Sequence, residues 1–270
     1  MILVLAAPWL WLAAFLGAPL AIVVVVALAE PADAIPPYAP GWHFENLALA
    51  VLDPFYRDAL LNSLWVASVA TLACLAIGYP MALAIARSAP RWRDTLLLAA
   101  MLPFWTGFLM RINAWIGLLR DDGPIDALGV WFGLGPARLL YTDTAMYLGL
   151  VYTYLPFMVL PLFAALSRRE TALEQAAADL GASPWGVFAR ITLPLSARGV
   201  VAGCALVFLP VVGEYVVPEL LGPPGASLVG RVVWGEFFAN RDWPMAAALA
   251  VIVLVVLLLP AAALRRWKAT

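Results

Sequence analysis

Long apolar stretches, separated by short polar or proline-rich segments, dominate this chain. A helix needs about 20 mainly apolar residues to cross the hydrocarbon core of a bilayer. Stretches of that kind lie at approximately 8–29, 59–86, 95–119, 144–166, 199–221 and 245–264. The pattern predicts an all-α integral membrane protein with six transmembrane helices in a single membrane domain, residues 1–270.

The composition agrees with a membrane protein. Of the 270 residues, 64% are hydrophobic and 12% are charged, whereas soluble chains are closer to half apolar and a quarter charged. The first stretch also has a feature of a cleaved signal peptide, the small-x-small run Ala27-Leu28-Ala29. Because it lacks a preceding basic segment and its apolar run is about twice the usual length, a retained helix is favoured. Whether the natural chain begins upstream of Met1 is left open.

Basic side chains gather in three segments, which follow the second, fourth and sixth predicted helices. They are Arg87, Arg91 and Arg93; Arg168, Arg169, Arg190 and Arg198; and Arg265, Arg266 and Lys268. Lys and Arg near helix ends are retained in the cytoplasm, so both termini are predicted to be cytoplasmic. The opposite face is then acidic, which either concentrates cations or only reflects where the basic residues are not.

The cytoplasmic segment 167–198 is predicted to form two short helices joined by a glycine. Residues 173–180 are rich in helix formers, and Gly181 suits a left-handed C-terminal cap. Ser183 and Pro184 supply an N-cap followed by proline at the first helical position. Four apolar side chains of this segment are expected to be exposed unless something covers them, which favours docking of a protein partner. They are Leu180, Trp185, Val187 and Phe188.

The same segment resembles a known loop. Gln175-Ala176-Ala177, then Gly181-Ala182 and Ile191-Thr192-Leu193-Pro194, are similar to the EAA loop of bacterial ABC importer permeases, which seats in a cleft of the cytoplasmic ATPase. The family's first glutamate is replaced by Gln175, with Glu174 one place earlier, so an ionic contact there is weakened. The resemblance implies an ATPase-coupling loop that contains Glu174, Gln175, Ala176, Ala177, Gly181, Ala182, Ser183, Pro184, Trp185, Phe188, Leu193 and Pro194.

Other segments resemble the spermidine/putrescine permeases of that family. They are Leu52-Asp53-Pro54, Leu102-Pro103-Phe104-Trp105-Thr106, Leu155-Pro156-Phe157-Met158 and Asn240-Arg241-Asp242-Trp243-Pro244, while residues 213–222 are most similar to the putrescine-type permease. The resemblance implies a type I ABC importer permease fold in the bacterial inner membrane. It also implies a homologous second permease, two cytoplasmic ATPase subunits and a periplasmic polyamine-binding protein. ATP and Mg are then used by the partner ATPase, and no cofactor is expected in this chain.

Two carboxylates near the outer end of the fifth predicted helix are the leading candidates for substrate contact. Along a straight helix Glu214 lies about 22 Å from the inner end, and Glu219 lies one turn further. An intramembrane carboxylate is costly unless it faces water or a cation, and ammonium groups bind carboxylates and aromatic faces. The predicted substrate path contains Glu214, Tyr215, Glu219, Trp234, Asp242, Trp243 and Arg111. Alternatively, Glu214 pairs with Arg111 and only fixes helix packing.

Other chemistries have little support. His43 is the only histidine, and Cys74 and Cys204 lie singly in apolar stretches, so neither a metal site nor a disulfide framework is expected. The sequence has no phosphate-binding Gly-x-x-x-x-Gly-Lys-Ser/Thr run, which favours a transport subunit over an ATP-hydrolysing enzyme. The nearly neutral charge argues against nucleic acid. The alternatives left open are a permease for an anion or ferric iron, an intramembrane enzyme and a structural membrane subunit.

Overall fold

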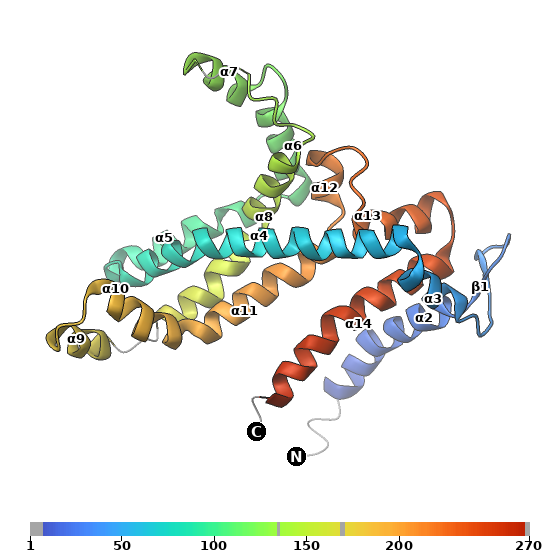
Figure 1. Cartoon of the computed structure of the whole chain (residues 1–270), viewed down its shortest axis with the longest axis horizontal. Coiled ribbons are helices and arrows are strands. Elements are labelled where there is room, and N and C mark those ends of the chain that lie inside the picture. Colours follow the sequence, from blue (N-terminus) through green and yellow to red (C-terminus); the bar gives the residue numbers. More distant parts are fainter. Residues whose placement is uncertain (1–7, 134–135, 168–170, 268–270) are drawn as a thin grey trace. The chain divides into compact units, whose positions relative to one another are not determined.

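The computed structural model describes residues 8–133, 136–167 and 171–267, most of which are helical (Figure 1). The chain divides into two compact units, Met1–Leu64 with Ser227–Thr270, and Trp65–Ala226. Helix α4 (Pro54–Arg87) contributes residues to both units.

The first unit is built around the packing of α14 (Trp243–Trp267) against α2 (Ala18–Ala27) and α3 (Glu45–Leu52), and α2 and α14 run side by side in Figure 1. Its other elements are η1 (Ala13–Gly17), β1 (Glu30–Pro31), β2 (Tyr38–Ala39), α13 (Val229–Trp234) and η4 (Gly235–Ala239). Small residues dominate the core, which includes Ala27, Ala50, Ala59 and Ala248. Asn46 donates hydrogen bonds to the carbonyls of Ala27 and Ala29, at 3.2 and 2.9 Å, and so satisfies acceptors that the end of α2 leaves free.

The second unit contains the rest of α4 and a helix pair, α8 (Asp143–Ser167) and α11 (Leu193–Val212). Its other elements are α5 (Pro90–Met101), η2 (Leu102–Trp105), α6 (Phe108–Leu119), α7 (Pro124–Trp131), α9 (Thr171–Asp179), α10 (Pro184–Val187), η3 (Phe188–Thr192) and α12 (Val216–Leu221). Glycine lets α8 and α11 approach closely: a Cβ on Gly199 would lie 2.6 Å from Ala165 Cβ and 2.8 Å from the Pro161 carbonyl oxygen. Small residues at helix contacts are typical of membrane helices.

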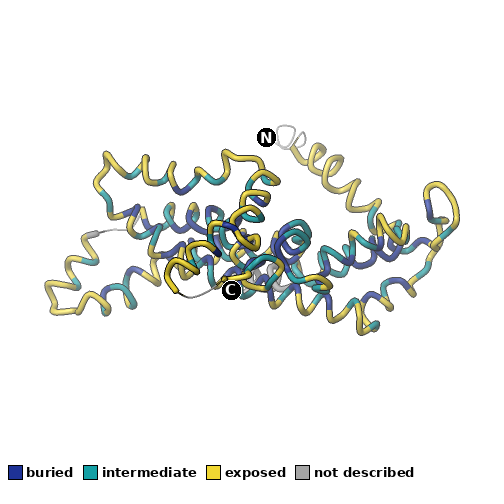
Figure 2. Tube along the Cα trace, turned by 90° about the horizontal axis from the view of Figure 1, so that it is seen from above, coloured by how far each residue is buried: buried dark blue, intermediate teal, exposed yellow. Residues whose placement is uncertain are grey.

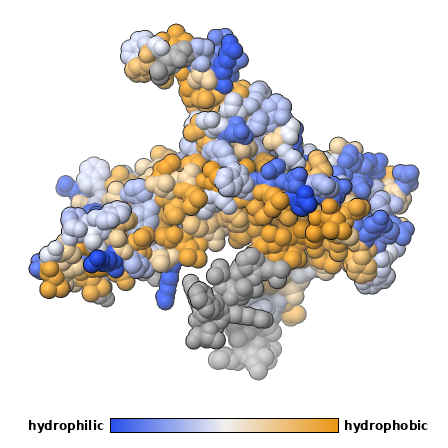
Figure 3. Space-filling model, viewed as in Figure 1, coloured by the Kyte–Doolittle hydropathy of each residue, from blue (hydrophilic) through white to orange (hydrophobic). Residues whose placement is uncertain are grey.

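Four described helices are long and apolar enough to cross a membrane: Pro8–Ala27, Pro54–Arg87, Asp143–Ser167 and Pro184–Val212. The pair Pro90–Trp105 and Phe108–Trp131, bent by 88°, makes a fifth if it is one broken span, and Trp243–Leu258 is a shorter apolar helix. The helix Pro8–Ala27 is exposed over most of its length (Figure 2). Hydrophobic residues cover much of the visible helix surface (Figure 3). Such apolar surfaces require lipid or protein neighbours. The number of six membrane spans stays a prediction.

Two predicted helices are interrupted. The stretch 95–119 breaks between Trp105 and Phe108, where Pro103 lacks an N–H and the Thr106 hydroxyl donates to the Pro103 carbonyl at 3.0 Å. The stretch 199–221 breaks after Val212 and resumes at Val216. A straight-helix distance therefore applies to Glu214 only as far as Val212, and it does not apply across the break that precedes Arg111.

A short connection after α6 is held by a buried carboxylate. Asp126 of α7 accepts hydrogen bonds from the backbone N–H groups of Arg138 at 3.0 Å, Asp122 at 3.1 Å and Ala137 at 2.8 Å. These donors, the Arg138 N–H most of all, lower the pKa of Asp126 because they stabilise its charged form.

Candidate functional site

The turn between α9 and α10 has the predicted glycine cap. Gly181 adopts a φ of +86°, its N–H donates to the Ala178 carbonyl at 2.9 Å, and the Ala182 N–H donates to the Ala177 carbonyl at 3.0 Å. This pair of bonds is the Schellman arrangement, which terminates a helix and satisfies its last carbonyls. The Ser183 hydroxyl then accepts from the Gly186 N–H at 3.2 Å and caps α10.

The second helix of the segment differs from the prediction. Instead of forming a second short helix, α10 passes through the π-helical turn η3 directly into α11, so that Pro184–Val212 is continuous. Pro194 has no N–H to donate, but it does not end the helix, which continues past it directly after the π-helical turn. Segment 167–198 is therefore one short helix, a turn, and the start of a long helix. Its residues 168–170 lie outside those described.

Polar and aromatic contacts fix the segment to the rest of its unit. Glu174 accepts a hydrogen bond from the Thr192 hydroxyl at 2.7 Å and lies 3.7 Å from the Arg87 guanidinium. Phe188 meets the Tyr79 ring edge-on at 5.6 Å between ring centres and stacks on Trp185 at 5.3 Å. Arg87 and Tyr79 were not predicted to take part, since no motif marks them. Thr192 stands in the quoted run Ile191-Thr192-Leu193-Pro194, but its bond to Glu174 was not predicted.

The tip of this segment presents apolar residues. Leu180 is 90% exposed and Trp185 is 74% exposed. The expected exposure of Val187 and Phe188 is wrong, since Val187 is buried and Phe188 is half-buried against Tyr79 and Trp185. Several other members of the predicted coupling loop are exposed as well: Gln175, Ala176, Gly181, Ala182, Ser183, Pro184, Leu193 and Pro194. An exposed apolar tip on an anchored turn is a suitable docking surface for a protein.

The structure places Glu214 at a helix break. Gly213 ends α11, and the Glu214 carboxylate accepts from the backbone N–H groups of Val216 at 2.9 Å and Val217 at 3.3 Å, at the start of α12. The Tyr154 hydroxyl of α8 donates to the other carboxylate oxygen. The sequence did not identify Tyr154, whose position in α8 gives no sign of its partner.

The remaining predicted residues of this unit have separate surroundings. Tyr215 precedes α12, and its carbonyl accepts from the Glu219 N–H at 3.0 Å. Among described residues no ion pair joins Arg111 to Glu214. The Arg111 guanidinium lies instead over the Phe104 and Phe108 rings, at 5.6 and 5.7 Å from their centres.

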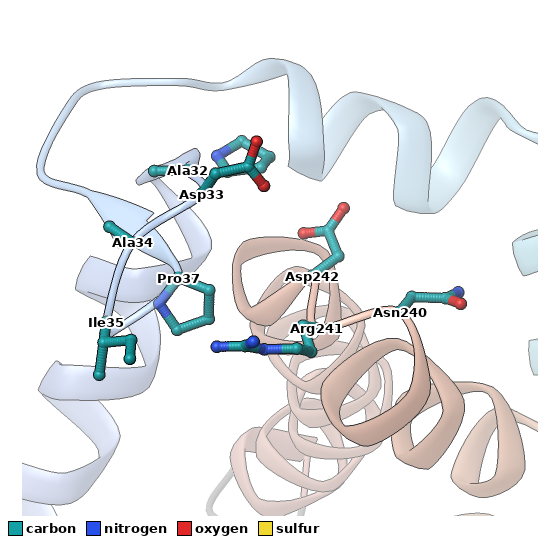
Figure 4. A pocket seen from close by; sticks show the side chains of 9 residues that line it. Ala32, Asp33, Ala34, Ile35, Pro37, Asn240, Arg241 and Asp242 are labelled. Atoms are coloured by element: carbon teal, nitrogen blue, oxygen red, sulfur yellow. The ribbon is translucent and has the colours of Figure 1, made fainter.

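The other three predicted residues belong to the first unit. Asp242 accepts from the Met245 N–H at 2.9 Å and caps α14, and Trp243 stacks on Phe237 with ring centres 4.8 Å apart. Trp234 lies against Phe238 at 4.1 Å. A pocket of about 580 Å³ lies beside Asp242, and Figure 4 shows its wall, which comes from residues 31–37 and 240–242 and includes Asp33 and Arg241.

Sequence reasoning missed one buried acid in this unit. Glu236 is 8% exposed; its carboxylate accepts from the Tyr56 hydroxyl at 3.0 Å and the Asn240 amide at 2.8 Å. An acid within the otherwise apolar run 232–239 is the signal that marked Glu214, and it was available here too. Across the described ranges, no three His, Cys, Asp or Glu side chains converge as metal ligands.

Comparison with known proteins identifies the family. The chain matches the family described as binding-protein-dependent transport system inner membrane component over residues 1–266. The spermidine/putrescine transport system permease protein PotB of Escherichia coli (strain K12) is 41% identical over 209 residues, 77% of this chain and 76% of that protein. PotB of Haemophilus influenzae is 39% identical over 211 residues, 77% of this chain and 74% of that protein. The molybdenum transport system permease protein ModB of Mycobacterium bovis is 29% identical over 92% of this chain and 89% of its own length.

A solved structure shows the same fold. A bacterial ABC transporter involved in the import of the acidic polysaccharide alginate superposes with a TM-score of 0.71, at 19% identity, over 98% of this chain and 94% of that chain. The resemblance to ABC importer permeases is thus confirmed, and the chain is a multi-pass transport subunit rather than an enzyme. By its sequence over nearly the whole length, this chain belongs to the family of inner membrane components of binding-protein-dependent transport systems.

Proposed function

We propose that the cargo of this permease is a polyamine, putrescine or spermidine. One observation carries the proposal: the half-buried Glu214 carboxylate is held by the Tyr154 hydroxyl and two backbone N–H groups, all neutral donors. Its negative charge is therefore fixed in place but not cancelled, which suits an ammonium group. The 41% identity to a spermidine/putrescine permease supports the same cargo.

Within the unit Trp65–Ala226 the proposed path begins at Glu214 and includes Tyr215 and Glu219. Trp234, Asp242 and Trp243 belong to the other unit, and their part in the path stays a prediction from the sequence. Carboxylates would bind the ammonium ends of the cargo, and aromatic faces would cover its methylene chain. Arg111 carries a positive charge and cannot bind an ammonium group itself.

Segment 167–198 is the proposed binding surface for the partner ATPase subunit. Its exposed Leu180 and Trp185 would enter the partner, and Glu174 would hold the base of the turn through Thr192 and Arg87. ATP and Mg are used in that partner and not in this chain. The proposed topology has six spans, counting the bent pair and α14, with both termini cytoplasmic.

The complete importer is proposed to contain this chain, a homologous second permease, two ATPase subunits and a periplasmic polyamine-binding protein. In this topology the pocket beside Asp33 and Asp242 faces the periplasm. The alginate transporter has been solved in complex with a periplasmic protein bound to an alginate pentasaccharide, which supports a binding protein as a partner.

The test is the ATPase activity of the reconstituted complex, with its binding protein, as putrescine, spermidine, sulfate, molybdate and ferric iron are added in turn. Stimulation by a polyamine alone is the expected result. Stimulation by an anion or by iron would retain the permease and refute the cargo. A complex whose ATPase responds to none of them would refute the proposed coupling as well.

A further inference from the structure

The guanidinium of Arg111 has no carboxylate partner within the part of the chain that the structure describes. Its Nε and Nη1 atoms are buried and make no hydrogen bond. The Phe104 and Phe108 rings stabilise the charge only in part, because a guanidinium has five N–H donors and each seeks an acceptor. An acceptor from outside the described residues is therefore expected.

A pocket of about 270 Å³ opens beside this group on α6. We call its wall the Arg111 face. It consists of Thr106, which precedes α6, of Met110, Arg111, Ala114, Trp115 and Leu118 of α6, and of Tyr152 of α8. Apart from the guanidinium, this wall is mainly apolar or aromatic. Met110 is 75% exposed and Leu118 is 40% exposed, so the face is uncovered in the single chain. It offers one cation surrounded by apolar surface.

The position of Arg111 limits what can neutralise it. Asp94 and Arg120 are the nearest charged residues along the chain, so Arg111 lies inside an apolar stretch of the third predicted span. A lipid phosphate reaches such a position only if the bilayer thins, and lipid tails supply no acceptor. A polyamine would be repelled. A carboxylate carried on an apolar helix supplies both the negative charge and the apolar covering.

We propose that a membrane helix of the second permease subunit covers the Arg111 face, and that one of its Asp or Glu carboxylates accepts hydrogen bonds from Arg111. This inference rests on the proposed function, since it requires a permease pair. Arg111 then holds the two permeases in register and does not touch the cargo. The pairing suggested from sequence, Arg111 with Glu214, is replaced by a pairing between subunits.

The test compares Arg111→Met with Arg120→Met in the chain coexpressed with the second permease and the ATPase subunits. Methionine keeps much of the apolar stem, and Arg120 is an exposed arginine at the end of the same helix. Leaving a buried charge unpaired is strongly destabilising, so Arg111→Met should reduce the second permease retained on the tagged chain at least about tenfold. Arg120→Met should retain it within about twofold.

A second arm identifies the partner carboxylate. Each Asp and Glu in the membrane helices of the second permease is replaced by Leu and combined with Arg111→Met. Because removing both members of a buried pair is far less harmful than removing one, a single combination should restore retention. If Arg111→Met does not accumulate, Arg111→Gln, which keeps hydrogen-bond donors without the charge, takes its place.

The outcomes are separable from those of the proposed function. Wild-type chain that retains no second permease refutes the permease pair before any variant is compared. Wild-type retention that is unchanged in Arg111→Met overturns the inference and leaves the importer intact. The complexes are also prepared in discs of phosphatidylcholine alone and with phosphatidylglycerol. The inference is also overturned if the wild-type chain retains the second permease only in discs that contain phosphatidylglycerol, while Arg111→Met retains it equally in both kinds of disc. Arg111 would then be assigned to a lipid phosphate.

Discussion

Substitution of Glu214 separates its structural role from its proposed role in transport. In Glu214→Gln, the amide oxygen can still accept from the Val216 and Val217 N–H groups, and the Tyr154 hydroxyl can turn to accept from the new amide. The cost is the difference between charged and neutral hydrogen bonds, about 1 kcal/mol. In Glu214→Ala all three donors lose their acceptor, at about 1–3 kcal/mol for each one left buried and unsatisfied.

The assay pairs uptake of labelled putrescine with thermal unfolding of the purified complex. Loss of one ion pair to the cargo, about 1.4–2.8 kcal/mol, corresponds to a tenfold to hundredfold drop in affinity. Glu214→Gln should show that drop with nearly wild-type unfolding, whereas Glu214→Ala should lose both uptake and stability.

Tyr154→Phe is the matched control, because it removes a donor and keeps the carboxylate charge. Its uptake should stay within a few-fold of wild type. Wild-type uptake by Glu214→Gln would refute the reasoning, since the charge would then have no part in binding. A Glu214→Gln complex as unstable as Glu214→Ala would show that the structural role cannot be separated in this way.

Three further predictions concern other parts of the chain. Ser183→Ala removes the cap of α10 and should weaken copurification of the ATPase severalfold, since an N-cap is worth about 1 kcal/mol. Gly199→Ala forces a methyl group against the Pro161 carbonyl and should lower the unfolding temperature of the chain, at about 1–3 kcal/mol, whereas Gly117→Ala, with nothing within 4 Å, should not. Asp126 has a lowered pKa in the folded chain. Its hydrogen bonds therefore stabilise the loop fully at pH values above the ordinary carboxyl pKa of about 4, and this stabilisation is lost as the pH falls through the lowered pKa of Asp126. Protection factors of the three donating amides should therefore fall only below about pH 4, and an Asp126→Asn variant should not show that fall.

Local features of the fold are predictable because they depend on neighbouring residues. The glycine cap at Gly181 and the N-cap at Ser183 require only the chemistry of a few positions, and both are present. The helix breaks are harder to predict. Hydropathy gives the length of an apolar stretch but not its direction, so 95–119 reads as one helix although Pro103 and Thr106 redirect it by 88°.

Contacts between residues that are distant along the chain cannot be predicted from the sequence, for a different reason. The partners of Glu214 and Glu174 lie on other helices, 60 and 18 residues away along the chain for Tyr154 and Thr192. Hydroxyl and backbone donors occur throughout the sequence, so composition cannot select among them. The sequence predicts that an intramembrane acid needs a partner, and only the structure shows which donor supplies it.

Glu214, which is half-buried, and Glu236, which is buried, are stabilised in the same way. Glu214 is held by Tyr154 and backbone N–H groups, and Glu236 by Tyr56 and Asn240. An arginine or lysine partner would cancel the negative charge, whereas a hydroxyl or amide donor orients the carboxylate and leaves that charge in place. Arg111 of α6 lies instead on aromatic rings. A permease for cations requires this separation, because a carboxylate already neutralised by arginine would gain little from an ammonium group.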